Sequence, residues 1–318
     1  VQVLVVPVGS LTPDPMTWAV PPAAVDLQSI TMTASTANAP LGVEYYFTCT
    51  AGGGHDSGWQ SSNVYTDTGL MPATTYTYTA KARDKGDVNH ETSPSEAKSA
   101  TTAPLPSLPS PNAYWLFDET SGTTAYDSIG GNDGTVLGGA TWAAGKFGNS
   151  LAFSATGQSL YVPSSSSIDF STGSFSVSMW AKQPTSYSGQ YELFIKGTIG
   201  GTGSFPGSGK RYELYRKDAN FRFAIDDDVT KTEISVPTTG ICTDGWVHIV
   251  AVRDVTADQI KLYINGSLVS SLTDNTGDIS QTEPLYMGYE MFPGAVDDVR
   301  IYSSALSAAQ VYAVYLGN

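Results

Sequence analysis

Hydrophobic and polar residues alternate along most of this chain, a pattern that predicts β-strands. In the first hundred residues the alternation is clearest in Ser29–Ala34, Val43–Thr50 and Thr75–Ala82. Later segments recur at short intervals, separated by turn residues: Ser174–Lys182, Tyr191–Lys196, Arg211–Arg216, Phe221–Ile225, Trp246–Arg253, Gln259–Ile264 and Ala295–Tyr302. Only Ser307–Leu316 has helical spacing, and Ser307 can cap that helix. We therefore predict an all-β protein with one short helix.

A proline-rich segment divides the chain. Pro104, Pro106, Pro109 and Pro111 make residues 104–112 a stiff, extended linker. The 318 residues are sufficient for two domains, which we place at 14–103 and 113–318. Residues 1–13 would be an N-terminal linker or an additional strand.

The composition excludes some classes of partner. With a formal net charge of -14 and a pI near 4.4, the chain is not expected to bind nucleic acid nonspecifically. No apolar run is long enough to span a bilayer. The acidic, Ser/Thr/Gly-rich character indicates a secreted protein. The sequence starts at Val1 without Met or a signal peptide, so we expect a monomeric piece of a longer chain.

Cysteine usage is sparse. Cys49 and Cys242 fall in different expected domains. A disulfide could join them, but two small buried hydrophobic residues are the more frequent case. Their redox state is therefore left open.

One turn in the first domain suggests its family. Gly69-Leu70-Met71-Pro72-Ala73-Thr74-Thr75-Tyr76 resembles the G-L-x-P-x-T-x-Y turn of fibronectin type III domains. In that family the Leu fills the core and the Tyr begins a late strand. The resemblance implies a seven-stranded sandwich over residues 14–103.

Seven blocks characterise the second domain: Trp115–Gly122, Ala125–Ser128, Gly145–Phe153, Phe175–Lys182, Trp246–Val252, Leu262–Gly266 and Gly294–Tyr302. In this order they resemble laminin-G-like jelly rolls of the concanavalin A-like superfamily. The resemblance implies two stacked curved sheets with the first and last strands close together. It also implies structural calcium near those ends in many members, and sugar binding on loops or on the concave sheet.

Two acidic stretches lie near the ends of this domain. If residues 295–302 alternate regularly, Asp297 shares the apolar face of Ala295, Val299 and Ile301, where a bare carboxylate is costly. Calcium takes six to eight oxygen ligands. The candidate oxygen donors are Asp297, Asp118, Glu119, Asp127, Asn132 and Asp133, with Asp297 and Asp118 first. The alternative is that Asp297 accepts backbone N–H groups and that Asp127 opens an Asx-turn.

The basic residues are clustered. Seven of the 16 Lys and Arg residues lie between positions 196 and 231, interleaved with aromatic residues. Arg can pair bidentately with sulfate or carboxylate, and Tyr can pack on a pyranose ring. The candidate ligand contacts are Arg211, Tyr212, Arg216, Lys196, Arg222, Tyr191 and Tyr215. The alternative is a solvated face of cross-strand ion pairs.

A catalytic site is not expected. Asp226 and Asp228 have the spacing of a carboxylate pair, but they look like a solvent-exposed turn. Arg211–Leu214 resembles an R-x-E-L strand of certain alginate lyases, without the partner motifs of those enzymes. His55, His90 and His248 give no credible triad.

The sequence thus predicts a secreted, non-catalytic carbohydrate-binding module stabilised by calcium, with a polysaccharide ligand that is anionic (sulfated or uronic). One alternative is a surface adhesion or filament subunit, in which the apolar run Val1–Val8 would pair with a neighbour. Another is a glycoside hydrolase or polysaccharide lyase with an unrecognised site.

Overall fold

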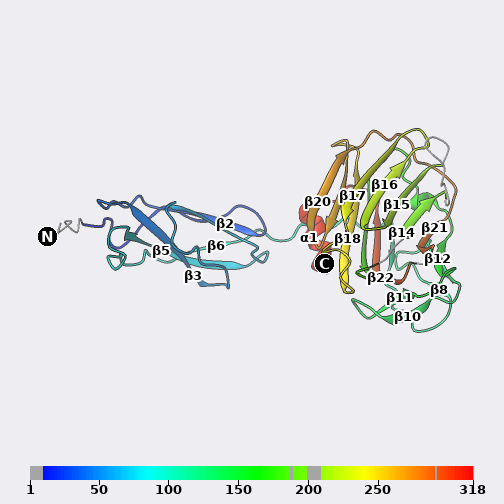
Figure 1. Ribbon diagram of the computed structural model, residues 1–318, viewed down its shortest axis with the longest axis horizontal. Helices are drawn as coiled ribbons and strands as arrows, with labels where there is room; N and C mark the ends of the chain where they lie inside the picture. The colour runs from blue at the N-terminus through cyan, green and yellow to red at the C-terminus, as the bar shows by residue number, and fades with distance from the viewer. Residues whose placement is uncertain (1–9, 187–188, 199–208, 291, 318) are drawn as a thin grey trace. The chain divides into compact units, whose positions relative to one another are not determined.

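A computed structural model describes residues 10–186, 189–198, 209–290 and 292–317. The run Val1–Val8 and most of the Gly-rich segment 197–209 lie outside the described residues. The chain divides into two compact units, Val1–Pro106 and Ser107–Asn318. Nearly all regular elements of both units are strands, which confirms the all-β prediction (Figure 1).

The first unit contains two three-stranded antiparallel sheets. One has the order β1-β2-β4 and the other β3-β5-β6. The first sheet consists of β1 Trp18–Ala24, β2 Ser29–Ala34 and β4 Val64–Thr68. The second consists of β3 Val43–Ala51, β5 Thr75–Asp84 and β6 Lys98–Thr101. Leu70 is buried in the core between them, and the Tyr76 hydroxyl accepts the Met71 N–H at 2.8 Å. The fibronectin III-like assignment stays a prediction.

The second unit contains two eight-stranded sheets. We call the first the back sheet; its order is β10-β11-β22-β13-β18-β19-β20, with β7 also paired to β22. Its strands are β7 Ala113–Trp115, β10 Thr141–Ala144, β11 Asn149–Phe153, β13 Phe175–Lys182, β18 Trp246–Asp254, β19 Gln259–Ile264, β20 Ser267–Thr273 and β22 Gly294–Tyr302. The pairing of β7 with β22 places the first and last strands side by side, as expected.

We call the other sheet the front sheet; its order is β17-β16-β15-β14-β21-β12-β9-β8. Its strands are β8 Thr124–Ala125, β9 Gly134–Leu137, β12 Ser159–Val162, β14 Gln190–Gly197, β15 Arg211–Lys217, β16 Asn220–Asp226, β17 Lys231–Pro237 and β21 Leu285–Tyr289. A short 3₁₀ turn, Ser166–Ile168, lies between β12 and β13.

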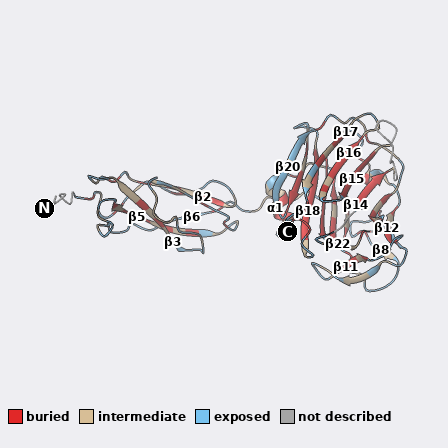
Figure 2. Cartoon of the chain, viewed as in Figure 1, coloured by how far each residue is buried: buried red, intermediate tan, exposed pale blue. Residues whose placement is uncertain are grey.

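One large core fills the space between these two sheets, with aromatic residues such as Trp115, Phe175 and Phe223 fully or almost fully buried (Figure 2). The helix α1, Ala308–Tyr315, packs Val311 and Val314 on the outer face of the back sheet. Ser307 caps it as predicted, accepting the Gln310 N–H. Within the described residues, no helix is long and apolar enough to cross a bilayer.

The regular alternation expected in β22 is wrong. A β-bulge interrupts its pairing with β13, and Asp298 within it has a φ of +48°. Because of the extra residue, Val296, Val299 and Ile301 all reach the core, whereas Ala295 pairs with the outward Lys182. Asp297 therefore does not share the face of Val299 and Ile301. Asp118 lies after the end of β7, which spans Ala113–Trp115.

Candidate functional site: the outer face of the front sheet

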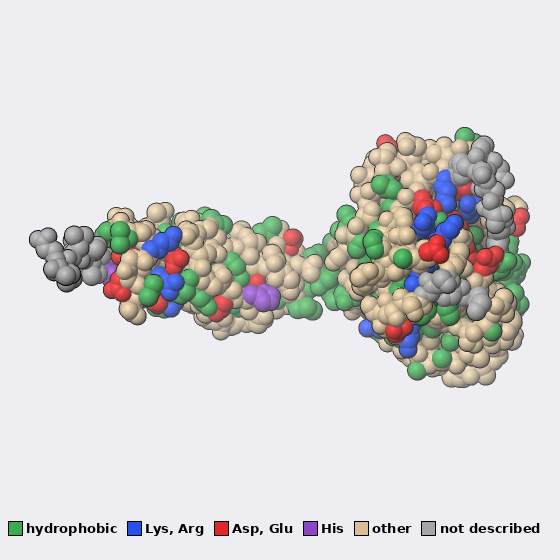
Figure 3. Space-filling view, viewed as in Figure 1, with side chains coloured by type: hydrophobic (Ala, Val, Ile, Leu, Met, Phe, Trp, Pro, Cys, Tyr) green, Lys and Arg blue, Asp and Glu red, His purple; other side chains and the backbone are tan. Residues whose placement is uncertain are grey.

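The strands β15, β16 and β17 present their polar residues on the outer face of the front sheet. Cross-strand register pairs Arg211 with Asp226, Tyr215 with Arg222, and Asp226 with Lys231. The alternate residues of these strands, including Tyr212, Phe223 and Ile234, fill the core. Period-2 alternation thus gathers the charged residues of three strands on one surface (Figure 3).

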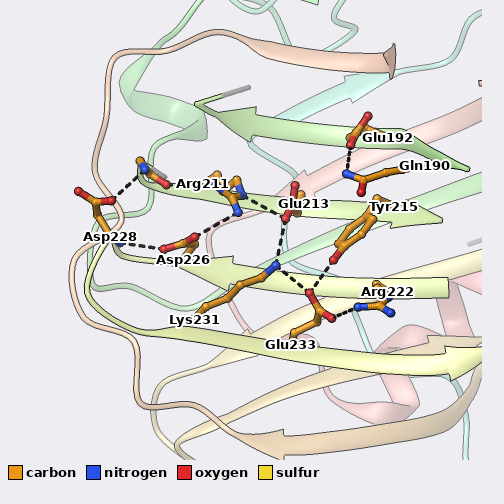
Figure 4. Close-up of polar contacts among 11 residues, drawn as sticks. Gln190, Glu192, Arg211, Glu213, Tyr215, Arg222, Asp226, Asp228, Lys231 and Glu233 are labelled. Carbon is orange, nitrogen blue, oxygen red and sulfur yellow. Dashed lines mark hydrogen bonds and ion pairs between the residues drawn. The ribbon is translucent and has the colours of Figure 1, made fainter. Parts of the chain in front are cut away.

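These charged side chains bind one another in a continuous network (Figure 4). Arg211 contacts Glu213 at 3.1 Å and Asp226 at 3.2 Å. Lys231 lies between Glu233, at 2.7 Å, and Glu213, at 3.7 Å. Arg211 and Lys231 therefore each have at least one carboxylate partner.

Glu233 is the centre of the second half of the network. It also accepts a hydrogen bond from the Tyr215 hydroxyl at 2.6 Å and contacts Arg222. Its pKa is held below the ordinary value because Lys231, Tyr215 and Arg222 stabilise its ionised form against the cost of burial. The cross-strand ion pairs that the sequence left open as an alternative are thus present.

Four of the seven predicted ligand contacts point away from this face. Tyr191 and Tyr212 are in the core between the sheets, 0% and 2% exposed. The Lys196 ammonium donates to the Glu283 carbonyl at 2.6 Å and to Ser164, and burial lowers its pKa to about 8. Arg216 is buried and donates to the Pro184 and Thr185 carbonyls. Arg211, Tyr215 and Arg222 are the three predicted contacts that lie on the outer face.

A row of tyrosines continues the same face on the other side of β14. Tyr161 and Tyr286 are cross-strand partners with ring centroids 5.5 Å apart, and Tyr286 lies 5.3 Å from Tyr289. All three are partly exposed. They lie outside the basic segment that drew attention in the sequence. One sequence pattern could have indicated this face: Tyr286 lies between Leu285 and Met287, which both face the core, so its own side chain faces outward.

Glu192 lies between the tyrosine row and the charged network. Its cross-strand partners are Tyr289 on one side and Tyr215 on the other. The carboxyl group is 5% exposed; one oxygen accepts from the Gln190 amide at 2.8 Å, and the other has no partner among the described residues. Burial raises its pKa to about 7. Sequence reasoning missed this residue.

The predicted metal ligands separate into two groups, and Asp127 and Asn132 form the first. The Asp127 carboxylate accepts the backbone N–H groups of Tyr114, Ile129 and Asn132. The Asn132 side chain donates to Asp127 and accepts from Ser165 and Ser167. Asp127 therefore forms the Asx-turn that the sequence left open, and both side chains are occupied by protein partners.

Asp297 and Asp118 form the second group, and they line one cavity of about 140 Å³. Asp297 is 0% exposed; Oδ2 accepts the N–H groups of Lys146 and Phe147, while Oδ1 has no partner among the described residues. One oxygen of the nearby Glu119 is also buried without a partner there. These orphaned oxygens suit a hard cation. However, no cluster of three acidic, His or Cys side chains surrounds a common point within the described ranges.

The residues considered for catalysis have structural partners. Asp226 is fully buried beside Arg211, so the expected solvent-exposed turn is wrong at this residue. His248 is 1% exposed and lies 2.9 Å from the Ser178 hydroxyl; burial lowers its pKa to about 3, so it is neutral. Cys49 and Cys242 are free thiols.

Residues 154–312 match the family model described as the concanavalin A-like lectin/glucanases superfamily. The chain belongs to this superfamily. The match covers most strands of both sheets, and it confirms the jelly-roll fold predicted for the C-terminal part. A search of the curated proteins gave no match.

Solved structures similar to this chain include toxin binding domains. The botulinum neurotoxin serotype D binding domain has a TM-score of 0.53 at 18% identity, covering 65% of this chain and 51% of that one. The binding domain of Paraclostridial Mosquitocidal Protein 1 has a TM-score of 0.51 at 20% identity, covering 64% and 51%. A serotype D ligand-binding domain in complex with N-acetylneuraminic acid has a TM-score of 0.53 at 17% identity, covering 66% and 51%. The match spans about half of each of these domains, and identities this low show the fold alone.

Proposed function

We propose that the second unit is a non-catalytic carbohydrate-binding domain and that its ligand lies on the outer face of the front sheet. The observation that carries the proposal is the row of partly exposed tyrosines, Tyr161, Tyr286 and Tyr289, beside the polar network. The lectin-type fold and a structural relative in complex with a sugar also support it. We also propose that the domain is secreted as a module of a polysaccharide-degrading protein.

The chemistry of this face suits a saccharide. Aromatic rings offer flat apolar area for the C–H face of a pyranose, and tyrosines keep a hydroxyl for hydrogen bonding. Gln190 and Glu192 supply a donor and an acceptor beside the rings, and Tyr215 lies beyond them. Ligand sites combine apolar area with a few polar groups in this way.

The preference for an anionic polysaccharide is a separate prediction. Arg211, Arg222 and Lys231 already have carboxylate partners, so a sulfate or uronate bound by them would have to compete with Glu213, Asp226 and Glu233. The network thus gives the anionic preference little support, and the tyrosine row fits a neutral sugar equally well. A salt titration separates the two, because charge pairing weakens with ionic strength and stacking does not.

The test compares two tyrosines of the same unit. Tyr286→Ala should lower affinity for a bound polysaccharide about tenfold or more, measured by affinity electrophoresis against a panel of neutral, sulfated and uronic polysaccharides. Tyr126→Ala is the control, because Tyr126 is 61% exposed and has no ring contact among the described residues. Equal effects of both substitutions would contradict the proposed site. Release of product from the panel would contradict the non-catalytic reading.

Structural calcium at Asp297 and Asp118 is also a proposal. It is supported by the orphaned Asp297 oxygen and by the cavity that both carboxylates line. An ion there would join the segment after the first strand to the last strand. Chelation of calcium-loaded protein should lower the Tm by several degrees, and Asp297→Ala should abolish that difference.

Asp127→Ala provides the control for calcium. Asp127 binds backbone N–H groups, so its loss should lower the Tm by a similar amount with and without chelator. A Tm of the calcium-loaded wild type that does not respond to chelation would rule the site out.

A further inference from the structure

A groove crosses the outer face of the back sheet, away from the tyrosine row. Its volume is about 490 Å³, within the range of small-ligand sites. Its floor follows the strand register: Ala152 pairs with Ala295, Ala295 with Lys182, and Lys182 with Trp246. Four strands thus contribute one row of residues, small on β11 and β22 and large on β13 and β18.

Small floor residues explain why the groove is open. Ala143, Ala152, Gly294 and Ala295 project little or nothing above the sheet, whereas Trp246 and Pro184 rise beside them. A ring-sized ligand lying on this floor would meet the partly exposed Trp246 indole at its side. Tryptophan combines a large apolar face with one N–H donor.

Two hydrogen-bond donors in the groove have no acceptor among the described residues. Within the part of the chain that the structure describes, neither the Lys182 ammonium nor the Trp246 N–H has a hydrogen-bond or ion-pair partner. Lys182 is exposed, and its two cross-strand neighbours, Ala295 and Trp246, are uncharged. This differs from the front sheet, where Arg211, Arg222 and Lys231 each meet a carboxylate.

The other polar residues that line the groove have partners or face the core. The one acid, Asp244, accepts from the N–H and hydroxyl of Thr185. Gln183 is 2% exposed, and its Oε1 accepts from the core residue Tyr191 at 3.0 Å. Lys182 and Trp246 are therefore the exposed donors of the groove.

We propose that this groove is a second carbohydrate-binding site and that it takes a sugar unit bearing a carboxylate. Trp246 stacks beside the pyranose ring, and Lys182 pairs with the carboxylate. A charge-assisted pair of this kind is stronger than a neutral hydrogen bond. The acidic preference expected from the sequence is therefore assigned to the back sheet, through a lysine outside the basic cluster.

The experiment uses the whole chain and two probes of equal length, an oligosaccharide of glucuronic acid and its neutral glucose counterpart, titrated by calorimetry. Tyr286→Ala serves as the background, so that binding at the tyrosine row is removed. In that background the uronate should still bind, and adding Lys182→Met should raise its Kd at least tenfold while changing the Kd of the neutral probe less than twofold. Lys85→Met, an exposed lysine of the first unit, is the charge-matched control and should change neither.

Filling the groove gives a second, independent variant. Ala152→Leu places a branched side chain on the floor and should abolish residual uronate binding with a Tm close to that of the parent. If Ala152→Leu unfolds the protein, the change in Kd on Lys182→Met alone tests the groove site. Loss of all uronate binding on Tyr286→Ala, absence of uronate binding to the wild type, or equal effects of Lys182→Met and Lys85→Met would each overturn the groove site. The first of these outcomes would leave the tyrosine site standing.

Discussion

The charged network of the front sheet and the groove of the back sheet use positive charge in opposite ways. On the front sheet, Arg211 and Lys231 lie among carboxylates that bind them within the protein. On the back sheet, Lys182 lies between Ala295 and Trp246, and its ammonium has no ion-pair partner among the described residues. The cations of the front network are therefore engaged within the protein, whereas an isolated lysine is available to a ligand. Pairing, and not local abundance, decides which cations can recognise an anion.

The largest expected effect tests whether the front network is structural. Asp226→Ala leaves Arg211 buried beside one carboxylate fewer, and removing one partner of a buried pair costs about 3–5 kcal/mol. Urea unfolding should show this loss. Glu283→Ala, an exposed acid before β21, should stay within about 0.5 kcal/mol of the wild type. A similar small change for Asp226→Ala would mean that the network is dispensable and its cations free for a ligand.

The next effect concerns pH and Glu192. Burial raises the pKa of this carboxyl from 4.5 to about 7, so the folded protein holds the proton more tightly than the unfolded chain. Its contribution to stability is complete below pH 4.5 and is lost as the pH rises through 7. The loss is at most about 3 kcal/mol. Glu192→Gln should flatten the fall in unfolding free energy between pH 5 and 8; an unchanged slope would place the carboxyl in water.

The smallest effect compares two lysines directly. Lys231→Met removes contacts with Glu233 and Glu213 and should cost about 1 kcal/mol, as for a partly exposed pair. Lys182→Met should change the unfolding free energy by less than about 0.5 kcal/mol, because the ammonium has no partner within the described residues. Thermal unfolding without ligand measures both. Equal losses would remove the distinction between the two faces.

Much of the fold follows from local pattern. Gln259–Ile264 was predicted with the bounds observed, and Arg211–Arg216 differs by one residue. The Asn265-Gly266 turn has φ values of +48° and +79°, as a tight hairpin requires. Arg211, Glu213 and Tyr215 are alternate residues of one strand and lie on one face, as the period of a strand requires. These features depend on a few consecutive residues, which is why they could be predicted.

The candidate sites depend on which sheet face is buried and on which distant strands pair, and alternation along one strand shows neither. Tyr212 and Lys196 look like ligand contacts in the sequence, but the side they face is fixed by the second sheet, which buries it. Tyr161 and Tyr286 are 125 positions apart and meet only through the pairing of β12 with β21. The groove needs the register of four strands at once. Such long-range pairings have no local signal.

The bulge at Asp298 has a consequence for how the last strand tolerates insertions and deletions. On either side of it, inward and outward residues follow opposite parity along the chain. Removing Asp298 would restore simple alternation with Val296, Val299 and Ile301 still on one face, whereas removing Arg300 would turn either Val299 or Ile301 toward solvent. The last strand should therefore tolerate loss of its bulge residue better than loss of a regularly paired one.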